Sequence, residues 1–175
     1  WNAVCLAGVT GSALAVVEAP ERRAFFVAAA EKSIQNFLSG FTPDGYCSEG
    51  LGYWNYGFGH FILLAETVCQ TTGGRLDLLE NPKVKQIAQF GLRMEILPGI
   101  YPAFADCHLS SQPDDRISAF VSRRYKFGWT EAERRGLALA DGASGSLFMT
   151  GLYDFPNSAS KRPAAKSSPR PLAGE

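Results

Sequence analysis

The fold is decided by residues 2–40, which read NAVCLAGVTGSALAVVEAPERRAFFVAAAEKSIQNFLSG. The first part, residues 2–18, is rich in Ala, Val and Leu and ends before Pro20, a pattern that predicts a buried helix. Pro20 suits the first turn of a second helix, which we expect to run to Ser39 because Gly40 is a common helix stop. Two long helices joined by so short a turn predict an antiparallel hairpin.

Helical patterns continue after this hairpin. A loop is expected over residues 41–52, followed by helices over residues 53–72, 82–97 and 113–125. Thr130-Glu-Ala-Glu133 is a capping-box pattern that predicts one more short helix. No segment shows the alternation and hairpin turns typical of strands. The sequence therefore predicts an all-α fold made of successive antiparallel helical hairpins.

The composition indicates one globular domain with a different C-terminal tail. The chain has 175 residues, of which 46% are hydrophobic and 19% charged, as is ordinary for a folded domain. Residues 157–175 are mostly Ser, Ala, Pro, Lys, Arg and Gly, a mixture that buries too little surface to offset the entropy of ordering. We expect a domain over residues 1–156 and a low-complexity, disordered tail over residues 157–175.

Charge and motif spacing exclude several classes of partner. Seventeen basic and seventeen acidic residues cancel, so nucleic acid is not an expected partner. No apolar run approaches the roughly 20 residues that span a bilayer, so no membrane span is expected. Four cysteines lack metal-site spacing and are predicted to be buried or free thiols, and His108 has no partner ligands at suitable spacing. We therefore expect no metal and no cofactor.

Candidate chemistry is concentrated between Tyr46 and His60. On a helix that begins near Tyr53, positions 53, 56 and 60 share one face, which would align two phenols with an imidazole. Glu49 precedes this helix, and such groups can together support proton transfer. Trp54 and Tyr101 offer flat rings of the kind that sugars stack against.

A packing interpretation of the same residues is also open. The aromatic side chains could fill the space between helices, His60 could be a hydrogen-bonded core residue, and Asn2 could cap a helix. Glycines 50, 52, 57 and 59 favour a functional site, because so many glycines in and beside a helix lower its stability without an evident packing role.

Three motifs resemble the heparinase II/III-type polysaccharide lyases and their alginate-lyase relatives. They are Trp1-Asn2-Ala-Val-Cys, Pro43-Asp44-Gly45 leading to Glu49-Gly-Leu-Gly-Tyr53-Trp54-Asn55-Tyr56-Gly57, and Tyr101-Pro-Ala-Phe104-Ala-Asp106. The resemblance covers about residues 1–110. It implies part of an (α/α) toroid, normally followed by a β-sandwich domain, and a periplasmic or secreted enzyme. It also implies an acidic polysaccharide substrate that contains uronic acid and is cleaved by β-elimination.

The resemblance assigns roles to residues of this chain. Asn2 would neutralise the uronate carboxylate, and Tyr53 would be the acid/base, with Tyr56 as the alternative one turn on. Glu49 would orient the site, and Trp54 would line a sugar subsite. Where the family often has a His near the Asn, this sequence has Trp1, Ala3 and Val4, so the His partner does not match. We expect little or no activity from this chain without the β-sandwich.

Two other functions remain open at this point. The chain could be a non-catalytic carbohydrate-binding or structural helical module. It could also belong to a helical-toroid glycoside hydrolase, which needs two carboxylic acids across a cleft. Glu49 and Asp106 are the candidates for that pair.

Overall fold

A computed structural model describes residues 1–138 of the chain, and these residues form helices and no strand. The elements follow in the order α1 (Asn2–Val16), α2 (Pro20–Ser39), α3 (Gly50–Tyr53), the π-helix η1 (Trp54–Phe58), α4 (Gly59–Thr71), the 3₁₀-helix η2 (Leu78–Glu80), α5 (Pro82–Arg93), α6 (Asp115–Tyr125) and α7 (Thr130–Ala138). The predicted all-α class is confirmed. Among these residues no helix has both the length and the apolar character required to cross a lipid bilayer. The tail expected over residues 157–175 lies outside the described residues.

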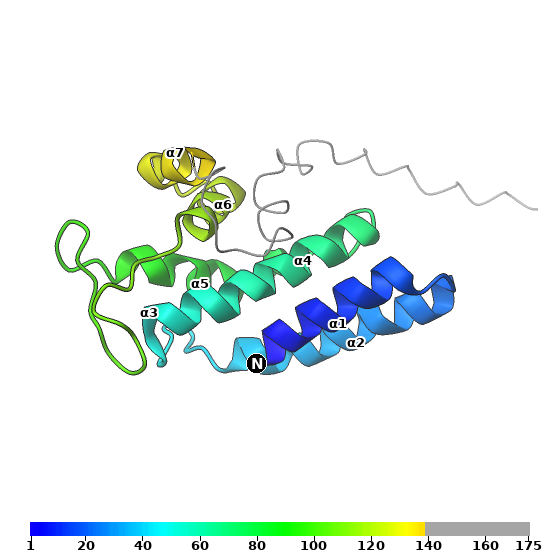
Figure 1. Ribbon diagram of the computed structural model, residues 1–175. Helices are drawn as coiled ribbons and strands as arrows, with labels where there is room; N and C mark the ends of the chain where they lie inside the picture. The colour runs from blue at the N-terminus through cyan, green and yellow to red at the C-terminus, as the bar shows by residue number, and fades with distance from the viewer. Residues whose placement is uncertain (139–175) are drawn as a thin grey trace, which may run out of the picture.

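The first two helices form the predicted antiparallel hairpin. α1 ends at Val16 and α2 begins at Pro20, so a three-residue turn joins them. α1 also packs along α4, and Figure 1 shows α4 running beside α1 in the same direction. Small side chains of α1, namely Ala3, Ala7, Thr10 and Ala13, are buried and let these helices approach closely. The hairpin and α4 thus make one layer of three helices.

Stacked aromatic rings form the centre of the core. The Trp54 ring stacks on Phe58 with centroids 5.4 Å apart, and Phe58 stacks on Phe61 at 5.7 Å. Phe61 in turn stacks on Phe37 of α2 at 6.0 Å. Trp54, Phe58 and Phe61 are each at most 1% exposed. This column of rings connects the π-helix to α2 and includes the three largest fully buried side chains of the described residues.

The Trp54 indole also joins the π-helix to α5. Its Nε1–H donates a hydrogen bond of 2.9 Å to the backbone carbonyl of Ile87. A Cβ atom at Gly91 would lie 2.7 Å from the indole ring, so α5 can approach the ring only because residue 91 is a glycine. A buried N–H must find a partner to avoid a desolvation cost, and Ile87 supplies it.

The helix expected over residues 53–72 begins earlier and is not regular. It runs from Gly50 to Thr71 as α3, η1 and α4, with five residues in π-helical conformation. Two of its glycines, Gly50 and Gly57, have packing roles. The expectation that these glycines have no packing role is therefore wrong. A Cβ at Gly50 would lie 2.5 Å from the Cys107 sulfur, and one at Gly57 would lie 3.1 Å from the Phe37 ring. Gly50 also has a φ of +82°, a backbone conformation that residues with a side chain rarely adopt.

Two later helix ends differ from the prediction for local reasons. α5 ends at Arg93 instead of residue 97, because residues 96–100 form a tight turn. In this turn the Ile96 N–H donates to the Ile100 carbonyl, the Ile100 N–H donates to the Leu97 carbonyl, and the Gly99 N–H donates to the Glu95 carboxylate. α7 begins at Thr130 as expected, but the capping box does not form. The Glu133 carboxylate instead accepts a hydrogen bond from the Ser122 hydroxyl of α6.

Replacing Trp54 with Ala should lower the free energy of unfolding by about 3–5 kcal/mol, since a buried ring and a buried hydrogen bond are lost together. Urea or thermal unfolding followed by circular dichroism measures this loss. Trp1→Ala is the matched control, because Trp1 is 88% exposed, and its change should stay within about 0.5 kcal/mol. Similar losses in the two variants would contradict this account of the core.

Candidate functional site

A cleft of about 450 Å³ lies where the start of α1, the end of α2 and the segment from Cys47 to Gly57 meet. Pockets of roughly 300–1,000 Å³ are typical of small-ligand sites. The cleft is lined by Trp1, Ala3, Val4, Phe37, Gly40, Phe41, Cys47, Ser48, Glu49, Tyr53, Tyr56, Gly57 and Asp106.

Four residues singled out from the sequence line this cleft together. Tyr53 and Tyr56 are 45% and 44% exposed, so about half of each side chain is accessible. Glu49 immediately precedes α3 but makes no capping hydrogen bond with its side chain, which leaves its carboxylate available to the cleft. Asp106 reaches the same cleft from a segment 57 residues further along the chain than Glu49. The site thus combines two phenols with two carboxylates.

The π-helix changes the expected alignment of Tyr53, Tyr56 and His60. π-Helices are rare and occur often at functional sites. Tyr56 and His60 lie together, with ring centroids 4.8 Å apart, and His60 Nδ1 is 2.7 Å from the Tyr56 carbonyl oxygen. Because that oxygen only accepts, Nδ1 carries the proton and donates it. His60 is not among the residues that line the cleft, whereas both tyrosines are.

The prediction that Trp54 lines a sugar subsite is wrong. Trp54 is 1% exposed, and its ring packs between the core aromatics and Gly91, so no face of it is open to a sugar. Trp1 is the tryptophan that lines the cleft, with its ring edge-on to Tyr56 at a centroid distance of 6.4 Å. The sequence offered one signal for this role, namely a large aromatic residue placed just before the first helical residue of α1.

Asn2 and Tyr101 lie outside the lining of the cleft. Trp1, not Asn2, occupies the capping position of α1, so the capping interpretation of Asn2 is wrong. The Asn2 Oδ1 atom is buried and has no hydrogen-bond partner among the described residues, although the adjacent Trp1 and Ala3 line the cleft. Tyr101 packs against the core, and burial, followed by the nearby Glu95 carboxylate, raises its pKa.

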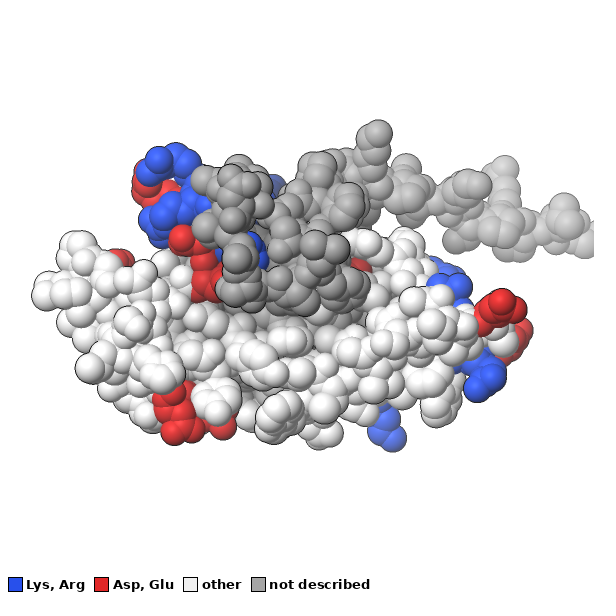
Figure 2. Space-filling view, viewed as in Figure 1, with Lys and Arg blue, Asp and Glu red and all other residues white. Residues whose placement is uncertain are grey.

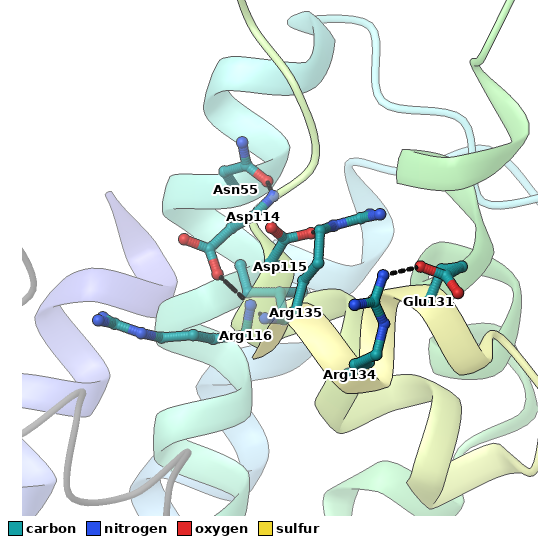
Figure 3. A network of polar contacts seen from close by, with 8 residues as sticks. Asn55, Asp114, Asp115, Arg116, Glu131, Arg134 and Arg135 are labelled. Atoms are coloured by element: carbon teal, nitrogen blue, oxygen red, sulfur yellow. Dashed lines mark hydrogen bonds and ion pairs between the residues drawn. The ribbon is translucent and has the colours of Figure 1, made fainter. Parts of the chain in front are cut away.

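Asn55 holds the segment that carries Asp106, a role that the sequence did not reveal. Its Nδ2 donates to the Gln112 carbonyl oxygen at 2.7 Å, and its Oδ1 accepts from the Asp114 N–H at 2.9 Å. Figure 3 shows Asn55 beside Asp114, whose carboxylate in turn caps α6 through the backbone N–H of Arg116. The amide of Asn55 therefore ties the C-terminal end of this segment, at residues 112 and 114, to the π-helix.

The cysteines near the cleft are free thiols with structural contacts. Burial raises the pKa of the Cys47 thiol, which keeps it protonated and a poor nucleophile. Cys107 Sγ accepts a hydrogen bond from Gly52 N–H at 3.2 Å. Cys5 and Cys69 are also free, so the prediction of free thiols is confirmed for all four. Within residues 1–138 no group of three or more His, Cys, Asp or Glu side chains could hold a metal ion.

The charge of the cleft is negative. Glu49 and Asp106 line it, and no Lys or Arg does so among the described residues. Figure 2 shows acidic side chains at the lower left, near the N-terminal end of α1, with no basic side chain beside them on that face. Neither carboxylate takes part in an ion pair within residues 1–138, where the pairs are Arg124–Asp77, Arg134–Glu131 and Arg135–Asp115.

Comparison with known protein families finds no family that matches this chain, and comparison with curated proteins finds no match either. Function is therefore inferred from the geometry of the cleft and from the motifs that supply its residues.

Replacing Asn55 with Ala should loosen the segment over residues 99–114, because both hydrogen bonds that fix its end are lost. Hydrogen exchange at the Asp114 amide should quicken, and proteolysis within the segment should become faster. Gln35→Ala is a suitable control, since the exposed Gln35 amide bonds only within α2 through the Glu31 carbonyl. Unchanged exchange at Asp114 in the Asn55 variant would show that other contacts hold this segment.

Proposed function

We propose that this chain forms part of a polysaccharide lyase that cleaves uronic-acid-containing glycans by β-elimination. The observation that carries the proposal is the meeting of Glu49, Tyr53, Tyr56 and Asp106 in one cleft, from motifs far apart in the sequence. Tyr53 is central, because its phenol is half exposed in the cleft while the neighbouring Trp54 anchors the helix in the core.

The reaction can be written with the groups of this chain. Tyr53, as its phenolate, takes the proton from C5 of the uronate, and the released electron pair forms the C4–C5 double bond as the bond from C4 to the glycosidic oxygen breaks. The phenol then returns its proton to that oxygen, so one side chain is base and then acid. Tyr56, which lines the same cleft, is the alternative for this role.

Removal of the C5 proton requires that the uronate carboxylate lose its charge. Asn2 would supply hydrogen bonds to that group as negative charge develops on it, which is a stabilisation of the oxyanion type. The position of Asn2 supports this role. It lies between Trp1 and Ala3, which line the cleft, and its Nδ2 amide group is a hydrogen-bond donor. Glu49, at the start of α3, would orient the sugar.

The exposed face of α1 supports a larger helical assembly. α1 has no charged residue over Asn2–Val16, and Val9 and Val16 on its outer side are 56% and 76% exposed. A helix that is apolar on all sides is normally covered on all sides. A further helical hairpin packed on this face would extend the layer of α1, α2 and α4 toward the (α/α) toroid, with a β-sandwich closing the cleft.

A helical-toroid glycoside hydrolase is the second candidate. One observation favours it. Glu49 and Asp106 line the same cleft although they lie 57 residues apart in the sequence. Such enzymes use one carboxylic acid to protonate the leaving oxygen and a second carboxylate as base or nucleophile. Hydrolysis produces new reducing ends without an unsaturated product, whereas elimination produces both a reducing end and an ultraviolet-absorbing double bond.

Replacing Tyr53 with Phe in the full-length protein that contains this sequence should lower the rate of release of unsaturated uronide by about 10²–10⁴-fold, the usual contribution of a general acid/base. Ultraviolet absorbance of the product, read against a reducing-end assay, measures the loss. Tyr46→Phe is the matched control, because Tyr46 packs on Phe90 and Phe104 outside the cleft. Reducing ends without absorbance would favour the hydrolase, and undiminished elimination in the Tyr53 variant would remove Tyr53 from the mechanism.

A further inference from the structure

The charge of the cleft restricts the sugars that can occupy it. Glu49 and Asp106 are exposed, line the cleft together, and lack an ion-pair partner within residues 1–138. A glycan that carries a carboxylate or sulfate on every sugar would place further negative charges beside these two. Like charges brought together in an interface oppose binding. The described wall of the cleft is therefore poorly matched to a uniformly anionic polymer.

The aromatic lining of the cleft suits a ligand that carries a positively charged group on an otherwise uncharged ring. Trp1 is 88% exposed and stands edge-on to Tyr56, and Tyr53 is 45% exposed beside them. Aromatic faces attract cations through the negative charge of the ring face, and Trp does so most strongly. They also provide a flat apolar surface for the C–H groups of a sugar ring. Carboxylates and aromatic faces together make a site for an amino sugar.

We propose that this cleft binds a hexosamine whose amine is unsubstituted, so that the glycan it recognises pairs uronate units with sugars that bear a free ammonium group. The proposal rests on the lyase function proposed above and names the second sugar of its substrate. The ammonium has three N–H donors and no acceptor, which matches two carboxylates that only accept. The uronate next to it would bring its single negative charge to the neutral amide of Asn2.

This pairing accounts for the absence of Lys and Arg from the described lining of the cleft. A repeat with one carboxylate and one ammonium carries no net charge, so it meets the two acidic side chains without overall repulsion. An N-acetylated hexosamine would lack the cation, and a polyuronate would add a second anion. The affinity of the cleft for the three classes of glycan should therefore follow their charge. It should be highest for the free amine, lower for the N-acetyl sugar and lowest for the uronate.

Binding of short oligosaccharides to the 175-residue chain tests the ranking. The probes are a glucosamine tetramer, an N-acetylglucosamine tetramer and a galacturonate tetramer, titrated by calorimetry or by NMR at low and high salt. The glucosamine tetramer should bind most tightly, and added salt should weaken it most, because the contacts are between exposed charges. Binding of the N-acetyl or galacturonate tetramer as tightly as the amine, or no binding of the amine, would overturn the proposal.

Variants of the two carboxylates locate the effect. Glu49→Gln and Asp106→Asn should each weaken binding of the glucosamine tetramer about two- to fivefold, as exposed charge pairs do, and should weaken binding of the N-acetyl tetramer less. Glu31→Gln, on the exposed side of α2, is the control and should change neither. Equal weakening of both tetramers, or weakening by the control alone, would contradict an ammonium contact in the cleft.

Failure of this inference can be told apart from failure of the lyase proposal. Elimination from a pure polyuronate by the full-length protein, with no preference for free amines, would overturn the amino-sugar inference and leave the lyase intact. Selective binding of the glucosamine tetramer, with no unsaturated product from the full-length protein, would overturn the lyase proposal and leave amino-sugar binding intact.

Discussion

The buried indole of Trp54 is the contact on which the rest of the described structure depends. Its N–H is bonded to the Ile87 carbonyl of α5, and its ring occupies the space that Gly91 leaves open. The same ring stacks on Phe58, which continues the column of aromatic rings through Phe61. Because one side chain both packs and satisfies a hydrogen bond, it fixes how the π-helix is rotated relative to α5.

This rotation sorts the residues of the π-helix among three environments. Trp54 and Phe58 face the core, Tyr56 and the preceding Tyr53 face the cleft, and Asn55 holds the backbone at residues 112 and 114. A π-helix closes its hydrogen bonds five residues apart and so distributes side chains differently from an α-helix. The same short element thus supports the core, positions the tyrosines and tethers the segment that brings Asp106 to the cleft.

The proposed chemistry and the proposed specificity have one electrostatic requirement in common. Elimination needs the charge of one carboxylate on the sugar to be neutralised, and the uncharged amide of Asn2 would do this without adding a cation to the cleft. The two acidic side chains of the cleft then favour a positive group on the adjoining sugar. Glu49 would take part in both, since it orients the sugar and contributes half of the negative charge.

The sequence by itself determined the helical class, the first hairpin and the segment in which the cleft lies. Local signals were sufficient there, because apolar patterning, Pro20 and the glycine-rich run near Tyr53 act over a few residues. Tertiary contacts decided which face of that segment is buried. Trp54, which the resemblance assigned to a sugar subsite, is buried instead, and Trp1 lines the cleft, because burial of Trp54 depends on Ile87 and Gly91, over 30 residues away. Only the folded chain could reveal this, since distant backbone groups create the space that a ring occupies.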